Sequence, residues 1–240
     1  MKGIILAGGT GSRLSPLTNV TNKHLLPVGK KPMILHSIDK LVESGIRDIM
    51  IVTGTEHMGD MISLLGSGNK WGCNLTYRVQ DKPDGIAGAL ILCENFCRDS
   101  DFVTILGDNI FNSNLRESIV QFKKMEATPK CLLNLCEVKD PSRFGVPTIK
   151  DNKIIKVTEK PTLPDSNFCV TGIYIYDRFA FNLIKHLNKS ERGEYEITDL
   201  NNLYIEKGTV GYRLFDSWWV DAGTHKSYQE ANRLSSENRE

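Results

Sequence analysis

Hydrophobic and polar positions in the first half of the chain form two kinds of run that take turns. Short, nearly continuous apolar runs predict buried strands at residues 2–7, 48–53, 75–79 and 102–106. Apolar residues three or four positions apart predict helices at residues 32–44, 58–65 and 86–96, the first of them ending at Gly45. Strands that alternate with helices at this interval predict crossover connections and an α/β fold with a doubly wound, mostly parallel, Rossmann-like sheet.

The pattern changes after about residue 130. Strand-like runs follow one another at residues 131–138, 145–149, 153–158 and 169–176, separated by turns, which predicts a smaller mixed or antiparallel lobe. Two helical segments at 180–187 and 197–206, a strand at 210–215 and a polar tail complete the chain. We expect one domain, with a core at about residues 1–130, the lobe returning to the core at about 131–226, and a C-terminal helix at 227–240.

Composition narrows the function classes. The chain has 240 residues, of which 40% are hydrophobic and 25% charged, as in an ordinary soluble globular protein. Thirty basic and 29 acidic residues give a net charge of +1, so no overall field favours nucleic acid or an anionic membrane. No apolar run suits a signal-peptide core or a membrane span, and we therefore expect a cytoplasmic protein without nucleic-acid or membrane partners.

The cysteines do not change this picture. The six cysteines form no CxxC pair, and the five histidines lie apart from them in the sequence. We therefore expect reduced, mostly buried thiols rather than a zinc site.

The loop after the first strand, LAGGTGSRLSPLT at residues 6–18, is rich in glycine. Such a turn at the carboxyl edge of a parallel sheet presents backbone N–H groups to anions. The loop lacks the third glycine of GxGxxG, and Ser12-Arg13 stands where the Walker pattern needs Lys and then Ser or Thr. Arg13, with Lys23 ten residues later, adds two cations to these amides, which favours a triphosphate site over a purely structural turn.

Polar side chains also follow several other strand-like runs. Asp108 follows the strand at 102–106, at the same edge as the glycine loop, and Asp221 ends a short run near the C-terminus. Two carboxylates from distant segments can hold one Mg²⁺, whereas either one alone is typical of a turn or a helix cap. Glu159 and Lys160 project an acid and a base from a strand end, and the Gln80 amide, which both donates and accepts, suits a nucleobase edge.

Taken together, these motifs resemble the sugar-nucleotide pyrophosphorylases, a nucleotidyltransferase family, and within them the short form of the glucose-1-phosphate thymidylyltransferases. The resemblance covers nearly the whole chain. It rests on LAGGTGSRLSPLT, NKHLLP at 22–27, KPM at 31–33, Gln80 with PDGIAGA at 83–89, LGDN at 106–109, RFGV at 143–146, EKP at 159–161, VTGIY at 170–174, RGEYEITD at 192–199 and DAGTH at 221–225.

The resemblance implies Mg²⁺-dependent nucleotidyl transfer from dTTP to α-D-glucose 1-phosphate, giving dTDP-glucose and pyrophosphate, by a protein expected to be a homo-oligomer. The catalytic residues that it implies are Arg13, Lys23, Asp108 and Lys160, and the metal ligands are Asp108 and Asp221. Nucleotide binding falls to Leu6, Gly8, Gly9, Gly11, Ser12, Arg13, Gln80, Pro83 and Gly85. Sugar-phosphate binding falls to Asn109 and, in the smaller sugar-binding lobe, to Gly145, Glu159, Lys160, Val170 and Arg192.

The chemistry of this reaction accounts for the residue types. A sugar-phosphate oxygen attacks the α-phosphorus in line while pyrophosphate leaves, and the two reactants repel each other through their negative charges. The attacking oxygen is already anionic at neutral pH, so no general base is needed. Positioning and charge neutralisation therefore carry the catalysis.

Three departures from the family pattern leave the substrate open. Gly88 stands where most members carry Gln, Phe144 where Tyr is frequent, and Pro147-Thr148 where an acidic residue is usual. The same chemistry with UTP, CTP or another sugar 1-phosphate is therefore an alternative, because thymine and uracil present the same polar edge to Gln80.

Readings from other classes are weaker. A non-catalytic sugar-nucleotide-binding protein of this fold should have lost one of the four charged residues Arg13, Lys23, Asp108 and Asp221, and all are present. A dinucleotide-dependent oxidoreductase needs the GxGxxG pattern that is missing here. The chain ends about where the shorter family members end, so we expect no accessory regulatory nucleotide site of the kind associated with a C-terminal helical extension.

Overall fold

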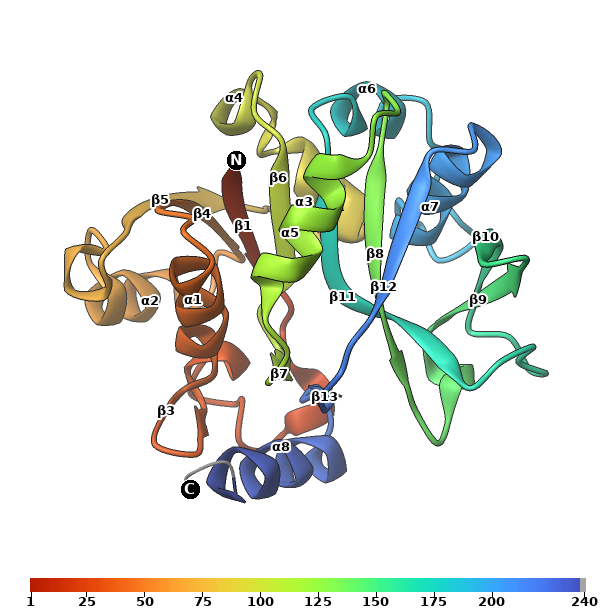
Figure 1. Ribbon diagram of the computed structural model, residues 1–240. Coiled ribbons are helices and arrows are strands. Elements are labelled where there is room, and N and C mark those ends of the chain that lie inside the picture. The colour runs from red at the N-terminus through yellow and green to blue at the C-terminus, as the bar shows by residue number, and fades with distance from the viewer. Residues whose placement is uncertain (238–240) are drawn as a thin grey trace.

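The computed structural model describes residues 1–237 and is built around one large sheet (Figure 1). Its strands are β1 (Lys2–Ala7), β4 (Asp48–Thr53), β5 (Asn74–Val79), β6 (Phe102–Leu106), β8 (Cys131–Glu137), β11 (Phe168–Tyr176) and β12 (Val210–Leu214). They lie in the order β12-β8-β11-β6-β1-β4-β5. Only β11 is antiparallel to its neighbours within this sheet, so the expected α/β fold with a mostly parallel sheet is confirmed.

The near-continuous apolar strands are explained by burial of both faces of the sheet. In β1, Ile4 and Leu6 belong to one core cluster, and Ile5 and Ala7 belong to the other. Successive side chains of a strand point to opposite faces, so a strand covered on both sides must be apolar at every position. The positions of the strands at 2–7, 48–53 and 102–106 are confirmed as predicted.

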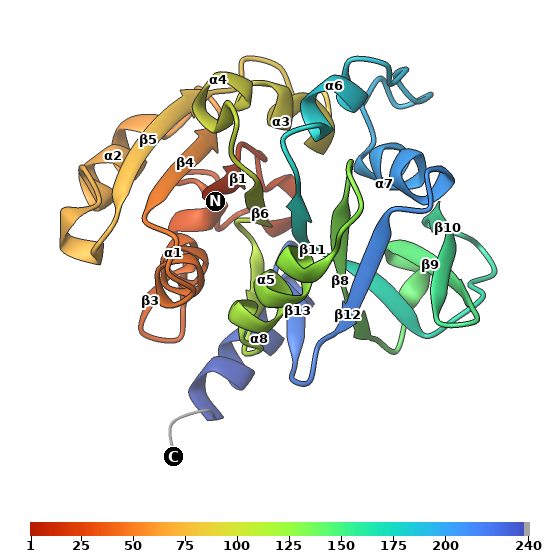
Figure 2. The same ribbon diagram turned by 45° about the horizontal axis from the view of Figure 1, so that its top comes forward.

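Helices cover both faces of the sheet (Figures 1 and 2). One face carries α1 (Met33–Glu43), α2 (Met58–Leu65) and α5 (Leu115–Lys124). The other carries α3 (Ile86–Ile91), α4 (Glu94–Cys97), α6 (Ala180–Ile184) and α7 (Ile197–Glu206). The last described helix, α8 (His225–Glu237), packs Ala231 into a separate small cluster with Ile110 and Ala222.

Short elements complete the described chain. The remaining strands are β2 (Pro27–Val28), β3 (Lys31–Pro32), β7 (Asn109–Phe111), β9 (Gly145–Lys150), β10 (Lys153–Glu159) and β13 (Trp219–Asp221). Single turns of 3₁₀ helix occur as η1 (Ser12–Leu14), η2 (Lys23–Leu25), η3 (Asn69–Trp71) and η4 (Pro141–Arg143).

Two helical predictions need correction, and one helix was not predicted. The helix expected at 86–96 is divided into α3 and α4, because the Cys93 N–H bonds to the Leu90 carbonyl and tightens the turn between them. The helix expected at 180–187 ends at Ile184. The next residues form turns instead, in which the His186 and Leu187 N–H groups donate to the carbonyls three residues before them. Helix α5 was not predicted, although Asn114 caps it by accepting from the Arg116 N–H at 2.9 Å and its apolar positions have helical spacing.

The second half of the chain contributes a small antiparallel sheet, as expected, but most of its strands join the central sheet. Of the strands after residue 130, β8, β11 and β12 extend the central sheet, whereas the antiparallel β9–β10 hairpin and β13, which pairs with β7, lie outside it (Figure 1). The difference follows from burial: β8 and β11 are almost entirely buried, so they need cover on both faces, which the central sheet and its helices provide. The predicted turn between β9 and β10 is present, with Asp151 and Asn152 at φ 48° and 58°. Of the C-terminal helix expected at 227–240, residues 238–240 lie outside the described part.

Two further observations bear on the composition. All six cysteines are buried and free of disulfides, so the expectation of buried thiols is confirmed. Within residues 1–237, none of the helices combines the length and the apolar character needed to cross a membrane.

Candidate active site

The carboxyl ends of β1, β4, β5 and β6 meet at one edge of the sheet, where a pocket of about 340 Å³ opens beside the glycine loop. We call it the glycine-loop pocket. Its volume lies within the range of small-molecule sites. Among its lining residues are nine predicted from the sequence: Leu6, Gly8, Gly9, Arg13, Lys23, Gln80, Pro83, Gly85 and Asp108.

A second pocket of about 240 Å³ lies between the sheet edge and the β9–β10 hairpin, and we call it the hairpin pocket. The predicted residues that line it are Arg13, Asp108, Asn109, Gly145, Glu159, Lys160, Val170 and Asp221. Four residues line both pockets: Arg13, Ile86, Leu106 and Asp108. The two pockets are therefore halves of one trough, with Asp108 and Arg13 at the junction.

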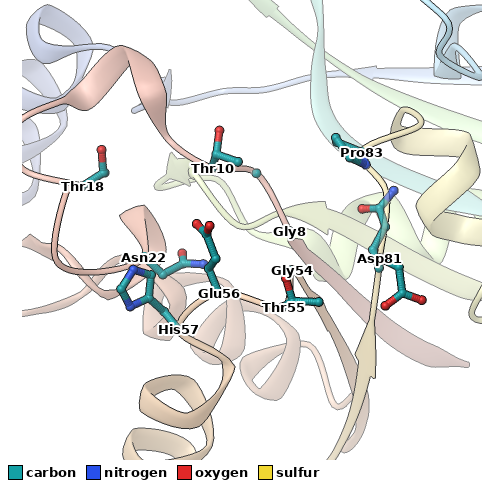
Figure 3. A pocket seen from close by; sticks show the side chains of 12 residues that line it. Gly8, Thr10, Thr18, Asn22, Gly54, Thr55, Glu56, His57, Asp81 and Pro83 are labelled. Carbon is teal, nitrogen blue, oxygen red and sulfur yellow. The ribbon is translucent and has the colours of Figure 1, made fainter.

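A smaller side pocket of about 140 Å³ adjoins the other end of the glycine-loop pocket (Figure 3). The two share Gly8, Gly9, Gln80 and Pro83. In Figure 3, Thr55, Glu56 and His57 follow the end of β4, and the Glu56 carboxylate is turned toward Thr10 of the glycine loop. The trough thus ends in a polar recess behind Gln80.

The glycines of the loop leave room for Lys23. Gly11 has φ 70°, and a Cβ there would lie 2.9 Å from Thr18 Cγ2 and 3.0 Å from Lys23 Cβ. A Cβ on Gly9 would lie 3.3 Å from Lys23 Nζ. A side chain at residue 11 would be strained by φ as well as crowded, so glycine is required for Lys23 to pass beneath the loop.

Lys23 reaches Asp108 inside the protein. Their Nζ and Oδ2 atoms are 2.5 Å apart, and the two residues are only 9% and 8% exposed. Burial by itself raises the pKa of Asp108, but the charges of Lys23 and His24 and the hydrogen bonds from Lys23 and Asn109 outweigh it. The net effect holds the pKa of Asp108 well below its usual range, so this carboxyl is ionised.

Asp221 reaches the same point by strand pairing. The short strands β7 and β13 are antiparallel, with Asp221 opposite Asn109, and the Ala222 N–H donates to the Asp108 carbonyl at 2.8 Å. A Cβ on Gly223 would lie 2.8 Å from Asp221 Oδ1 and 3.5 Å from Asp108 Oδ2. The two carboxylates therefore face one small space that glycine leaves open.

The electrostatics of Asp221 differ from those of Asp108. Burial is the largest cause that raises the pKa of Asp221, to about 6, and the Asp108 charge adds to it. Lys23, the Gly223 N–H, which donates to Asp221 Oδ1 at 2.9 Å, and Arg13 act in the opposite direction. The repulsion between two buried carboxylates is relieved by a neighbouring positive charge, and carboxylate oxygens are ligands that Mg²⁺ takes in proteins. The described residues contain no group of three or more His, Cys, Asp or Glu side chains placed to hold a metal.

Asn109 is the structural hub of this region. Its Oδ1 accepts from the Trp219 indole N–H at 2.7 Å and from the Gly172 N–H at 2.8 Å, and its Nδ2 donates to Asp108 Oδ1 at 3.0 Å. Asn109 lines the hairpin pocket as predicted for a sugar-phosphate contact, but most of its hydrogen-bonding capacity is used within the protein. It orients Asp108 and ties β7 to β11 and β13.

The hairpin presents Glu159 and Lys160 to the pocket. Pairing of β9 with β10 sets Glu159 opposite Gly145, and Glu159 Oε2 accepts from the Thr198 hydroxyl at 2.7 Å. Lys160 Nζ lies 3.2 Å from Glu159 Oε1. Lys160 has φ 43°, unusual for a residue with a side chain, and its N–H donates to the Phe144 carbonyl at 2.9 Å. Such local strain is frequent at functional sites.

Three residues predicted to bind substrate do not line the two larger pockets. Gly11, Ser12 and Arg192 line neither pocket. Gly11 acts through the shape of the loop, and Arg192 lies about half exposed with Nη2 2.8 Å from Glu196 Oε2 and 3.9 Å from Glu159 Oε1. Other lining residues were not proposed from the sequence, among them Ile86, Leu106, Arg143, Phe144, Gly172, Tyr174, Glu194, Thr198 and Trp219. Most of these stand inside or next to the motifs noted above, so proximity to a motif was the available signal.

Comparison with known proteins agrees with this geometry. The nucleotidyl transferase family model matches residues 2–238. A glucose-1-phosphate thymidylyltransferase from Neisseria meningitidis is 42% identical over 236 residues, 96% of this chain and 81% of the relative. One from Mycolicibacterium smegmatis is 36% identical, covering 97% of this chain and 81% of the relative.

Solved structures show the same relationship. The crystal structure of a provisionally assigned glucose-1-phosphate thymidylyltransferase from Bacillus anthracis, in complex with sucrose, is 54% identical, with a TM-score of 0.95 over 100% of this chain and 97% of that chain. A UDP-glucose pyrophosphorylase complexed with UDP-glucose shares the fold, with a TM-score of 0.86 at 23% identity over 99% of both chains. The resemblance seen in the sequence is therefore confirmed: the chain belongs to the nucleotidyl transferase family.

Proposed function

We propose that this protein transfers a thymidylyl group from dTTP to α-D-glucose 1-phosphate, with dTDP-glucose and pyrophosphate as products. The observation that carries the proposal is the trough of two joined pockets with Asp108 and Arg13 at their junction. A transfer reaction needs two substrates side by side and opposite charge where their phosphates meet. The relatives named as glucose-1-phosphate thymidylyltransferases favour this pair of substrates.

The residues divide into roles along the trough. The nucleoside triphosphate lies in the glycine-loop pocket, with its base toward Gln80 and its phosphates toward Lys23 and Arg13. The hexose lies in the hairpin pocket, where Glu159 accepts hydrogen bonds from its hydroxyls and Lys160 neutralises its phosphate. Arg13, which lines both pockets, stabilises the charge that develops on the leaving pyrophosphate.

Asp108 and Asp221 would hold the Mg²⁺ ion, because they are the two carboxylates that face the space beside Gly223. When bound, the ion withdraws negative charge from the reacting phosphates. Lys23 has a matching role in this proposal: by pairing with Asp108 it keeps a carboxylate ionised in a buried place. Asn109 orients the same carboxylate.

The experiment is a grid of pyrophosphate-release assays. Each of dTTP, UTP, dCTP, ATP and GTP is combined with the 1-phosphates of glucose, galactose and mannose, with Mg²⁺ or with EDTA. The proposal predicts a dominant rate with dTTP and glucose 1-phosphate that EDTA abolishes and added Mg²⁺ restores. A dominant rate elsewhere in the grid would move the substrate assignment. Absence of turnover from folded protein would contradict the enzymatic function and favour the binding-only alternative.

The protein's surroundings stay predictions. We propose a cytoplasmic protein that forms a homo-oligomer and binds neither nucleic acid nor membranes, in line with the balanced charge of +1. Sedimentation of the purified protein tests the oligomeric state, and fractionation of cells that express it tests the cytoplasmic location and the absence from membranes.

A further inference from the structure

The Gln80 amide is held in one orientation by Asp84. Gln80 follows β5 and lines both the glycine-loop pocket and the side pocket. Its Nε2 donates to Asp84 Oδ1 at 2.9 Å, while its Oε1 lies beside the glycine loop, 3.0 Å from where a Cβ on Gly8 would be. An ionised carboxylate only accepts hydrogen bonds, so the nitrogen of the amide, and not the oxygen, must face Asp84.

The position of the Asp84 carboxylate depends on Gly88. A Cβ on Gly88 would lie 2.4 Å from Asp84 Oδ1 and 2.7 Å from its Cγ, closer than any real contact. Gly88 is buried within α3, and glycine is less favourable than alanine in a helix. Its φ is not in the left-handed region, so the backbone does not call for glycine. Glycine is needed here because the Asp84 carboxylate occupies the space of a side chain. Gly88, a departure from the family pattern, therefore has a structural role.

The main chain around Asp84 is anchored separately from this side chain. The Tyr195 N–H donates to the Asp84 carbonyl at 2.8 Å, and the Ala87 N–H donates to the Tyr195 carbonyl at 3.2 Å. Gly85, at φ 96°, lets the two segments come this close. Changes to the Asp84 side chain alone should therefore leave the loop in place.

The orientation matters because a free glutamine does not distinguish pyrimidines. Thymine and uracil present a carbonyl acceptor next to an N–H donor, which match the amide nitrogen and oxygen of glutamine. Cytosine presents an amino donor next to a ring-nitrogen acceptor, which match the same amide turned by half a rotation. A glutamine that can turn serves both edges, whereas one that is held serves only one of them.

We propose that Asp84 is a positioning residue for nucleobase selection, which holds Gln80 so that its oxygen accepts from the ring N–H of thymine or uracil and cytosine is rejected. Gly88 permits this by leaving room for the carboxylate. The inference rests on the proposed function, since it takes the base of the triphosphate to lie against Gln80. Asp84 itself does not need to touch the nucleotide.

The test compares kcat/KM for dTTP, dUTP and dCTP with glucose 1-phosphate in three variants. Asp84→Asn keeps the shape of the side chain but lets it donate as well as accept, so Gln80 can turn. Gly88→Ala pushes the carboxylate away by a different route. Gly59→Ala is the matched control, because Gly59 lies in α2 with nothing within 4 Å of the added Cβ.

The preference for dTTP over dCTP should fall on the order of tenfold or more in Asp84→Asn and Gly88→Ala, as expected when a fixed hydrogen-bonding pattern is released. The dTTP to dUTP ratio should stay the same, because the two bases share their polar edge, and Gly59→Ala should match the wild type in both ratios. If Asp84 had a purely structural role, its substitution would lower the Tm of the protein, or lower kcat by the same factor with all three nucleotides.

The outcomes separate this inference from the proposed function. Unchanged dTTP to dCTP ratios in both variants, with an active wild type, would overturn the role of Asp84 and leave the enzyme assignment standing. A dTTP to dUTP ratio that falls as far as the dTTP to dCTP ratio would also overturn it. The held orientation of Gln80 concerns only the polar edge that thymine and uracil share, so it cannot distinguish these two bases. A wild type inactive with dTTP would refute the proposed function itself.

Discussion

Truncation of Asn109 is the most informative perturbation of the site. Asn109→Ala removes one oxygen that accepts two hydrogen bonds, from the Trp219 indole at 2.7 Å and from the Gly172 backbone at 2.8 Å. It also removes the donor that contacts Asp108. Asn109 is 1% exposed, so no bulk water replaces these partners.

The magnitude follows from the two donors left behind. Each buried donor without a partner costs about 1–3 kcal/mol, so the free energy of unfolding should fall by about 2–6 kcal/mol. This is a large part of the roughly 5–15 kcal/mol that stabilises a typical domain. Because Asp108 also loses a contact, we expect kcat to fall in the folded fraction of the variant as well.

Urea unfolding, followed by tryptophan fluorescence and circular dichroism, measures the effect. Asn182→Ala, on the exposed side of α6, is the control and should stay within about 0.5 kcal/mol of the wild type. A loss below about 1 kcal/mol for Asn109→Ala would refute the reasoning, because it would mean that the two donors find other partners. Asn109→Asp separates stability from function: it keeps the acceptor but sets a negative oxygen next to Asp108.

Other parts of the site make three further predictions. Lys23→Met leaves the buried Asp108 charge unpaired, so we expect the free energy of unfolding to fall by about 3–5 kcal/mol in urea titrations; an unchanged midpoint would count against the pair. Gly107→Ala places a Cβ 2.7 Å from His24 Cδ2, and a loss of about 1–3 kcal/mol is expected, measured as a lower Tm. Asp221→Asn should lower kcat on the order of a hundredfold or more while the circular dichroism spectrum stays native, and near-wild-type turnover would remove Asp221 from the proposed metal site.

Strands β1, β4, β5 and β6 and the loop between β1 and η1 could be predicted from the sequence alone. These features depend on local rules: apolar runs where both faces of a strand are covered, and glycines where the backbone takes positive φ, as at Gly11. The ordered motifs also indicated the family, because several of them supply residue types that suit phosphate, metal or nucleobase binding. The unpredicted helix α5 belongs to this local class, since its Asn114 cap and apolar spacing were visible in the sequence.

Where these elements meet depends on long-range packing, which the sequence pattern does not reveal. The sequence placed Asp108 and Asp221 at strand ends, but only the pairing of β7 with β13 makes these two aspartates neighbours. That pairing joins segments about 110 residues apart, and the hydrogen bond from Trp219 to Asn109 spans the same distance in sequence. The sequence could not show that β8 and β11 join the central sheet, because a buried strand has the same apolar pattern whichever sheet it extends. Likewise, the sequence showed Gly88 only as a departure from the family pattern. The structure explains it, because the Asp84 carboxylate lies against Gly88. The physical reason is general: periodicity records how a residue is buried, whereas partners across the chain depend on the packing of segments that are distant in sequence.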